Sequence, residues 1–145
     1  ANIRLSKMTN DRYTLKRKIE KGKGNKQSGL ELEIIDAYTG KERHVSTLSG
    51  GEGFKASLAL ALGLADVIQS YAGGVQIETM FVDEGFGTLD PESLDAAINS
   101  LMDLRDLGRL VGIISHVEEL RERIDARLEV TLGKSGSHAK FIVNN

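Results

Sequence analysis

Two adjacent carboxylates stand at the end of an apolar stretch, where Asp83 and Glu84 directly follow Met80-Phe81-Val82. Such neighbours repel each other unless a cation or a proton lies close by. A strand-end carboxylate can hold Mg²⁺ through water, because Mg²⁺ prefers oxygen ligands and keeps part of its water shell. The next carboxylate can orient or deprotonate a water that attacks a phosphoryl group. The pair predicts a phosphoryl-transfer site, and an exposed acidic strand end is the alternative.

A second candidate is the glycine-rich turn Leu48-Ser49-Gly50-Gly51-Glu52, which precedes an apolar helical segment. Glycines let backbone amides approach an anion closely. The helix that follows points its positive end and its unpaired N–H groups at the same place. Ser49 adds a hydroxyl donor. The turn predicts a phosphate-binding site, and a simple serine cap of the helix is the alternative.

His116 follows the apolar stretch Leu110 to Ile114 and Ser115. Beside a phosphate site it is a candidate contact to a γ-phosphate, and a hydrogen-bonded core histidine is the alternative.

A phosphate-binding P-loop reads G-x-x-x-x-G-K-[ST]. The stretch Gly22 to Gly29 has the wrong spacing for this pattern. The sequence therefore predicts no P-loop in this stretch.

The first third of the chain is predicted to be an antiparallel sheet. Alternation over Arg12 to Glu20 places Tyr13, Leu15 and Ile19 on one face, as in a half-buried strand. Further strands are expected over 30–36 and 43–45, separated by a turn at 38–40. A Gly/Lys/Ser loop is expected over 21–29.

The second part alternates helices and strands. The segment Glu52 to Ser70 is apolar almost all round, which predicts a buried helix. Strands are expected over 77–82 and 110–114, the latter buried as in a parallel sheet. Asp90 and Pro91 predict a helix start, with one apolar stripe and a stop at Gly108. A short charged helix from Glu118 and a hairpin turning at 133–136 complete the chain. Ligands of parallel sheets bind at the carboxyl ends of the strands.

Composition narrows the function classes. The chain has 145 residues, 40% hydrophobic and 28% charged, with a net charge of -2 and no cysteine. Disulfides and cysteine metal sites are thereby excluded. A net charge this small argues against bulk polycation binding to nucleic acid. The longest uncharged apolar stretch, 56–65, is too short for a membrane span. We therefore expect no membrane partner and a cytoplasmic location.

These motifs in this order resemble the ATP-binding-cassette (ABC) ATPases. Residues 48–52 look like the signature motif, with Leu48, Ser49, Gly50, Gly51 and Glu52 as ATP contacts. Residues 80–84 look like Walker B, with Asp83 as the metal residue and Glu84 as the catalytic glutamate. Gly87, Thr88, Leu89 and Asp90 look like the D-loop, and His116 like the catalytic switch histidine. The resemblance implies ATP and Mg²⁺ as cofactors.

The finer resemblance is to the SbcC branch of double-strand-break repair ATPases, which are SMC-like. It is carried by residues 47–52 with the following Ala-Ser-Leu-Ala-Leu-Ala-Leu, by 81–90 and by 114–120. The segment 53–55 departs from it, because that family more often has Ser or Thr and then Phe and Leu. The chain therefore looks like the C-terminal half of an ABC head with an α/β fold, in which an antiparallel segment is followed by an αβαβα parallel-sheet segment and a hairpin.

The resemblance also implies how the half-head acts. Residues 48–52 would contact ATP held by a second head, while Asp83, Glu84 and His116 would act on their own head's nucleotide. The implied partners are the N-terminal Walker A half of the same protein, a second head, an SbcD-like nuclease and double-stranded DNA. Alone, the chain is expected to be inactive. The rival reading is an SMC-like structural clamp or a degenerate cassette used only for dimerisation.

Basic residues between 16 and 26 offer a candidate contact to the DNA backbone. The candidates are Lys16, Lys18, Lys21, Lys23 and Lys26. A solvated hairpin is the alternative, and no aromatic residue interleaves the lysines to support base stacking.

The expected organisation is one domain over residues 1–145. Its segments are the end of a coiled-coil helix (1–11), antiparallel strands (12–46), a segment with signature helix, Walker B, D-loop and switch histidine (47–126), and a terminal hairpin (127–145).

Overall fold

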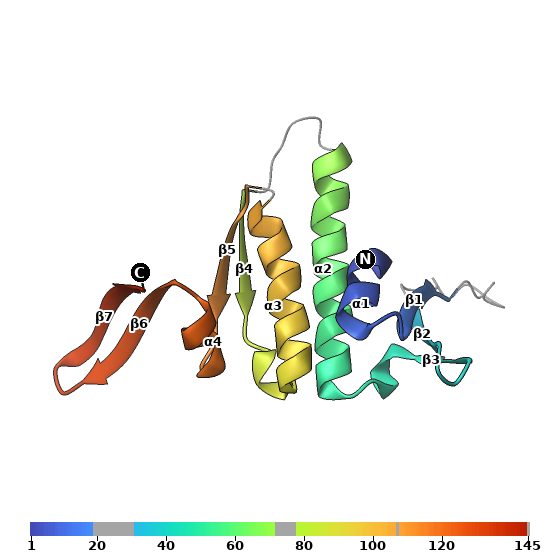
Figure 1. The fold of residues 1–145 in the computed structure, drawn as a ribbon, viewed down its shortest axis with the longest axis horizontal. Helices are drawn as coiled ribbons and strands as arrows, with labels where there is room; N and C mark the ends of the chain where they lie inside the picture. The colour runs from blue at the N-terminus through green and yellow to red at the C-terminus, as the bar shows by residue number, and fades with distance from the viewer. Residues whose placement is uncertain (19–30, 72–77, 107, 145) are drawn as a thin grey trace, which may run out of the picture. The chain divides into compact units, whose positions relative to one another are not determined.

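The computed structural model describes residues 1–18, 31–71, 78–106 and 108–144 (Figure 1). The chain divides into two compact units, Ala1–Ile114 and Ser115–Asn145. The predicted organisation as one domain stays a prediction. The loop expected over 21–29 lies outside the described residues.

The first unit begins with helix α1 (Asn2–Thr9) and a three-stranded antiparallel sheet, as predicted. The strands are β1 (Tyr13–Arg17), β2 (Leu32–Asp36) and β3 (Lys41–His44), in the order β1-β2-β3. The third strand starts two residues earlier than expected, and Val45 belongs to the short 3₁₀ helix η1 (Val45–Thr47). Tyr13 and Leu15 share the buried face, whereas Ile19 lies outside the described residues.

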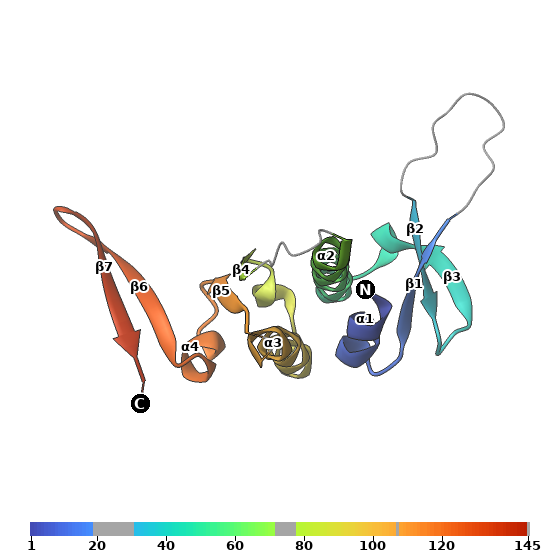
Figure 2. The same cartoon turned by 90° about the horizontal axis from the view of Figure 1, so that it is seen from above.

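Helix α1 is fastened to the sheet by the side chain of Asn2. Its amide donates to the carbonyl of Leu15 at 3.0 Å and accepts from the Leu15 N–H at 2.9 Å. Leu5 and Met8 are buried, and the helix contacts both long helices of the unit. This short helix therefore connects the antiparallel sheet to the helical layer, as Figure 2 shows from above.

Helix α2 (Gly50–Tyr71) is not buried all round, which corrects the sequence prediction. One face carries buried residues including Ala59 and Leu62, whereas Leu64 is 60% exposed and Tyr71 is 87% exposed. The prediction assumed that every apolar face is covered within this chain. Among the described residues, other elements pack against one side of α2 only, so an apolar face of this helix stays exposed.

Strands β4 (Thr79–Asp83) and β5 (Leu110–Ile114) form the predicted parallel pair, with Asp83 opposite Ile114. Strand β5 was predicted to be buried along its length, but Leu110 is 65% and Ile114 is 53% exposed. Parallel sheets normally have both faces covered by other elements. In the described residues Phe81 also remains 68% exposed.

Helix α3 (Pro91–Asp106) begins and packs as predicted. Asp90 caps it, since its carboxylate accepts from the Ser93 N–H at 2.9 Å, and proline suits the first helical position. The predicted apolar stripe is buried and consists of Leu94, Ala97, Ile98, Leu101 and Leu104. Gly108 follows the helix with a φ of 84°, a conformation that suits glycine after a helix end.

The second unit contains helix α4 (Glu119–Arg123) and an antiparallel hairpin of β6 (Ala126–Gly133) and β7 (Gly136–Val143). The hairpin turns between Gly133 and Gly136, as predicted. Leu128 faces Phe141 across the ladder, and both side chains are more than 60% exposed.

Candidate functional site: strand end, signature turn and D-loop

The two carboxylates lie at the carboxyl end of β4, where parallel sheets place their ligands. Asp83 is the last residue of the strand, and both Asp83 and Glu84 are exposed. Glu84 has a φ of 57°, and its N–H donates to the carbonyl of Ile114 at 2.9 Å. A left-handed backbone is uncommon for a glutamate and clusters at functional sites. This backbone conformation at Glu84 turns the chain where it leaves the sheet.

The turn after Glu84 depends on Gly85. Its φ is 98°, and a side chain there would place Cβ 2.3 Å from the ring of Phe54. Phe54 comes from α2 and packs edge-to-face against the buried Phe86, with ring centroids 4.9 Å apart. The aromatic pair joins the segment after the strand end to the first turns of α2. Residues 53–55, where the sequence departs from the family pattern, therefore include part of this contact.

The signature turn is closed by a reciprocal pair of hydrogen bonds, the capping box. The N–H of Ser49 donates to Glu52 Oε2 at 2.9 Å, and the N–H of Glu52 donates to Ser49 Oγ at 3.4 Å. The serine cap weighed in the sequence analysis is thus present. It does not use up the hydroxyl, since an oxygen that accepts from Glu52 keeps its own O–H to donate.

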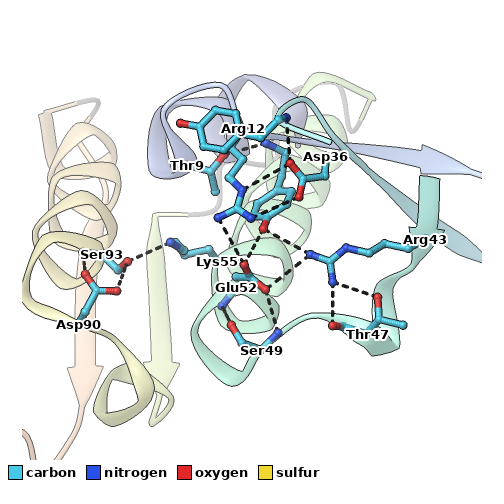
Figure 3. A network of polar contacts seen from close by, with 12 residues as sticks. Thr9, Arg12, Asp36, Arg43, Thr47, Ser49, Glu52, Lys55, Asp90 and Ser93 are labelled. Carbon is cyan, nitrogen blue, oxygen red and sulfur yellow. Dashed lines mark hydrogen bonds and ion pairs between the residues drawn. The ribbon is translucent and has the colours of Figure 1, made fainter. Parts of the chain in front are cut away.

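Two residues of the antiparallel sheet, Tyr13 and Arg43, hold Glu52, and Figure 3 shows Arg43 pointing toward it. The hydroxyl of Tyr13 donates to Glu52 Oε1 at 2.5 Å, and Arg43 Nη2 lies 3.8 Å from Glu52 Oε2. Arg43 also donates to the Thr47 carbonyl at 2.8 Å and to the Tyr13 hydroxyl at 3.3 Å. Neither Tyr13 nor Arg43 is among the site residues predicted from the sequence.

The surroundings of Glu52 favour its charged form. Burial raises the pKa of Glu52, but hydrogen bonds from Tyr13 and Ser49 and the charge of Arg43 outweigh it, so the net shift is downward. Burial and the neighbouring carboxylate raise the pKa of the Tyr13 hydroxyl. Glu52 is therefore an ionised acceptor and Tyr13 a neutral donor around neutral pH.

A second ion pair supports this arrangement from the sheet. Arg12 donates to both carboxylate oxygens of Asp36, at 3.5 and 3.3 Å. Its hydrogen bond lowers the pKa of Asp36. The guanidinium lies 4.7 Å from the ring centre of Tyr13 and 5.1 Å from that of Tyr38, within cation–π range. Arg12 thus packs against the tyrosine that contacts Glu52.

The signature turn touches the predicted D-loop. A Cβ on Gly51 would lie 3.0 Å from the carbonyl oxygen of Thr88, and one on Gly50 would lie 3.5 Å from the Thr88 Cβ. Glycine at position 51 permits the close approach, whereas the distance at Gly50 is an ordinary van der Waals contact. The structure therefore brings together residues 50–51 and 88–89, which are separated by a long helix and a strand in the sequence.

A lysine forms a second link between the same segments. Lys55 Nζ donates to Ser93 Oγ at 2.9 Å, and Ser93 Oγ donates to Asp90 Oδ2 at 2.7 Å. Hydrogen bonds from the Ser93 side chain and backbone lower the pKa of Asp90. Lys55 lies in α2 and Asp90 at the end of the D-loop, so the chain Lys55–Ser93–Asp90 spans the two elements.

A cleft of about 850 Å³ opens where these elements meet within the first unit. The end of α1, the start of β1, the signature turn, the D-loop and the first turns of α3 contribute to its walls. Its lining includes Arg12, Tyr13, Ser49, Gly50, Gly51, Glu52, Lys55, Thr88 and Asp90. The cleft thus collects both signs of charge beside the exposed Ser49 hydroxyl.

His116 belongs to the second compact unit, and it is exposed. Its predicted contact to phosphate stays a prediction. Among the described residues, no group of three or more His, Asp or Glu side chains could hold a metal ion. Mg²⁺ is commonly bound by one or two carboxylates together with water and substrate phosphates. The exposed carboxylate of Asp83 fits that requirement.

Only two of the five lysines proposed for DNA lie in the described part of the chain. Lys16 contacts Glu42 at 2.8 Å, and Lys18 lies 3.9 Å from Glu33. Lys21, Lys23 and Lys26 fall outside the described residues. No helix in the described part of the chain is long and apolar enough to cross a membrane.

A family model described as "SbcC/RAD50-like, Walker B motif" matches residues 25–103. The chain is 58% identical over 98% of its length to the SbcC component of the nuclease SbcCD from Vibrio cholerae. It is 55% identical over 97% of its length to the corresponding protein from Staphylococcus haemolyticus. The chain spans 14% of the length of each of these curated relatives.

Solved structures show the same fold at low sequence identity. The SMC head domain from Thermotoga maritima is 18% identical with a TM-score of 0.59, over 99% of this chain and 46% of that one. An SMC head bound to the C-terminal winged-helix domain of ScpA is 15% identical with a TM-score of 0.70, over 98% and 41%. The fold is therefore that of part of an SMC-type ATPase head, since the chain covers less than half of either structure. With the family match over more than half its length, the chain belongs to the SbcC/RAD50-like Walker B family.

Proposed function

We propose that this chain is the C-terminal lobe of an SbcC-like ATPase that binds and hydrolyses ATP between two heads. The observation that carries the proposal is the strand end: Asp83 and Glu84 are exposed at the carboxyl end of β4, with Glu84 in a left-handed backbone. ATP binding would join two heads and hydrolysis would release them. The cycle would control DNA binding and processing by an SbcD-like nuclease.

At the strand end each residue has its own proposed role. Asp83 would hold Mg²⁺ through water, and the ion would neutralise charge on the phosphates. Glu84 would orient and deprotonate the attacking water. His116, from the second unit, would contact the γ-phosphate of the same nucleotide. The positive φ of Glu84 supports its role, because it fixes the direction in which the side chain leaves the strand.

The signature turn would act on the nucleotide of the opposite head. Gly50 and Gly51 occupy the first two positions of α2, where backbone N–H groups have no intrahelical acceptor. Those groups and the Ser49 hydroxyl would bind phosphate oxygens at the positive end of the helix. Thr88 and Asp90 of the D-loop line the same cleft and would meet the second head there.

The N-terminal Walker A half of the same protein is the proposed cover for the open apolar faces. On α2 these are Leu64, Val67 and Ile68, exposed by 60%, 50% and 43%. On the parallel pair Phe81 is 68% exposed. Surfaces of this kind are characteristic of interaction sites, and the chain spans only 14% of its relatives. Supply of the P-loop by that half explains why we expect the chain to be inactive alone.

A structural clamp without hydrolysis remains the second candidate. The fold shared with SMC heads is compatible with either reading, whereas Glu84 favours hydrolysis because a clamp needs no residue to activate water. Double-stranded DNA is a proposed partner for either reading. Lys16 and Lys18 add little to the DNA proposal, because each lies near a carboxylate that offsets its positive charge.

The test is Glu84→Gln in the full-length protein, followed by the lifetime of the ATP-bound head dimer. The substitution keeps size and polarity but removes the proton acceptor, so we expect hydrolysis to fall by about two to three orders of magnitude and the dimer to persist longer. Glu78→Gln, an exposed glutamate before the other end of β4, is the matched control and should leave both unchanged. An unchanged dimer lifetime with Glu84→Gln would remove Glu84 from this role.

A further inference from the structure

The antiparallel sheet reaches the signature turn through one carboxylate. Glu52 Oε2 accepts from the Ser49 N–H at 2.9 Å, while Glu52 Oε1 accepts from the Tyr13 hydroxyl at 2.5 Å. The two oxygens of one side chain thus connect a strand residue to the backbone of the serine. Rotation of the Glu52 carboxylate would break both bonds together.

Tyr13 is well placed to prevent that rotation. It is only 3% exposed, and its strand is paired with β2. A buried aromatic ring is restricted by its neighbours, and its hydroxyl therefore points in a fixed direction. The bond to an ionised acceptor is of the stronger, charge-assisted kind. Tyr13 therefore gives Glu52 a rigid reference on the sheet.

Arg43 adds a second restraint on the chain that leads into the turn. It donates to both the carbonyl and the hydroxyl of Thr47, at 2.8 and 3.1 Å. Its 3.8 Å approach to Glu52 is a loose, partly exposed ion pair, which contributes little by itself. Its main effect is geometric, because it fixes the backbone two residues before Ser49.

The capping box then decides how the serine hydroxyl is presented. With its N–H held by Glu52 and its Oγ accepting from the Glu52 N–H, Ser49 has one conformation that satisfies both bonds. The remaining O–H points away from the helix N–H group. A donor fixed in advance needs no reorganisation when a phosphate arrives, which is the advantage of a preorganised site.

We propose that Tyr13 and Arg43 are positioning residues that hold Ser49, through Glu52 and Thr47, in the conformation that binds the phosphate of the opposite head. The inference rests on the proposed function, in which Ser49 acts across the head–head interface. It assigns to the antiparallel sheet a part in ATP hydrolysis by the second head. Neither residue touches the nucleotide in this scheme.

The experiment uses mixed pairs of full-length proteins. One protein carries a substitution of its Walker A lysine, so it offers a signature turn but holds no ATP. The other carries Ser49→Arg, so it holds ATP but offers a blocked signature turn. Each is inactive by itself, and the mixture has one composite site. Activity of this mixture tests the proposed function, and its absence would overturn the composite site together with the inference.

Tyr13→Phe is then placed in either member of the mixture. It removes the hydroxyl and keeps the ring, so the loss of one charge-assisted bond should lower kcat about tenfold when it lies in the protein that offers the signature turn. The KM for ATP should stay unchanged, because the other head holds the nucleotide. In the protein that holds ATP, the same substitution should have no effect. A general folding defect would instead lower activity in both placements.

Two further variants sharpen the outcome. Tyr38→Phe makes the same chemical change on a ring that is 74% exposed, and it should leave activity unchanged in either placement. Arg43→Gln should lower kcat in the signature-offering protein only. An active mixture in which Tyr13→Phe has no effect, or an equal effect in both placements, would overturn the inference and leave the proposed function intact.

Discussion

The signature turn and the strand end are built in different ways, although both are proposed to meet ATP phosphates, the turn on the opposite head and the strand end on its own head. The signature turn is fixed by side chains: Ser49 and Glu52 bond each other, and Tyr13 holds the carboxylate. The strand end is fixed by its backbone, through the positive φ of Glu84 and Gly85 and the bond from the Glu84 N–H to Ile114.

This difference has a physical consequence. A turn held by side chains depends on residues far away in sequence, and a change in the antiparallel sheet can reach it. A turn held by backbone geometry depends on local sterics, and a change in one glycine can destroy it. The two regions should therefore respond to different kinds of substitution, and that difference can be measured.

The largest expected effect is at the strand end, with Gly85→Ala. The new methyl group would have to tolerate a φ of 98° and would lie 2.3 Å from the Phe54 ring. We expect a loss of about 3 kcal/mol in the free energy of unfolding, from backbone strain and overpacking. Denaturant unfolding of the assembled head measures it. Gly108→Ala, with a φ of 84° and open space around it, is the control that carries the strain alone and should lose less. Equal losses would remove the aromatic contact from this account.

A pair of glycines tests the signature turn. Gly51→Ala would place a methyl group 3.0 Å from the Thr88 carbonyl, whereas Gly53 has open space around its Cβ position. Gly53→Ala should stabilise the helix by about 0.5–1 kcal/mol, because alanine loses less backbone entropy. Gly51→Ala should gain less than that or lose stability. Thermal unfolding of both variants gives the comparison. Equal shifts of the two unfolding midpoints would mean that the D-loop accommodates the methyl group at position 51 with no loss of stability.

The smallest expected effect is a pH dependence of stability. The pKa values of Glu52, Asp36 and Asp90 are lower in the folded protein than their ordinary values of 4.5, 3.8 and 3.8. A carboxylate with a lowered folded pKa contributes stability that is complete above its ordinary pKa and is lost as pH falls through the folded pKa. The urea midpoint should therefore be level near neutral pH and fall below about pH 4.5. Glu52→Gln should flatten part of that fall, and an unchanged slope would contradict the contribution of Glu52.

Local patterns predicted the elements best. Asp90 and Pro91 marked the start of α3, and the stripe from Leu94 to Leu104 is its buried face. The pattern S-x-x-E at 49–52 also contained the capping box, and it could have revealed the part played by Glu52. These features lie within a few residues of one another, so the sequence shows them directly.

Cross-strand contacts and missing partners could not be predicted in the same way. The alternation predicts only that Tyr13 lies on the buried face of a strand. The pairing of β1 with β2 and of β2 with β3 is what brings it to Arg43. The apolar pattern of α2 indicated burial, yet Leu64 and Val67 are exposed in this chain. A sequence pattern reports that a face needs covering, and it does not report which chain supplies the cover.

The most direct test of the central claim is steady-state ATP hydrolysis by this chain alone and mixed with the N-terminal half of the same protein. Hydrolysis only in the mixture, abolished by Glu84→Gln in this chain, is the predicted result. Hydrolysis by this chain alone would contradict the account, because the P-loop is expected from the other half. A co-purifying mixture with no hydrolysis would also contradict it and would favour the structural clamp.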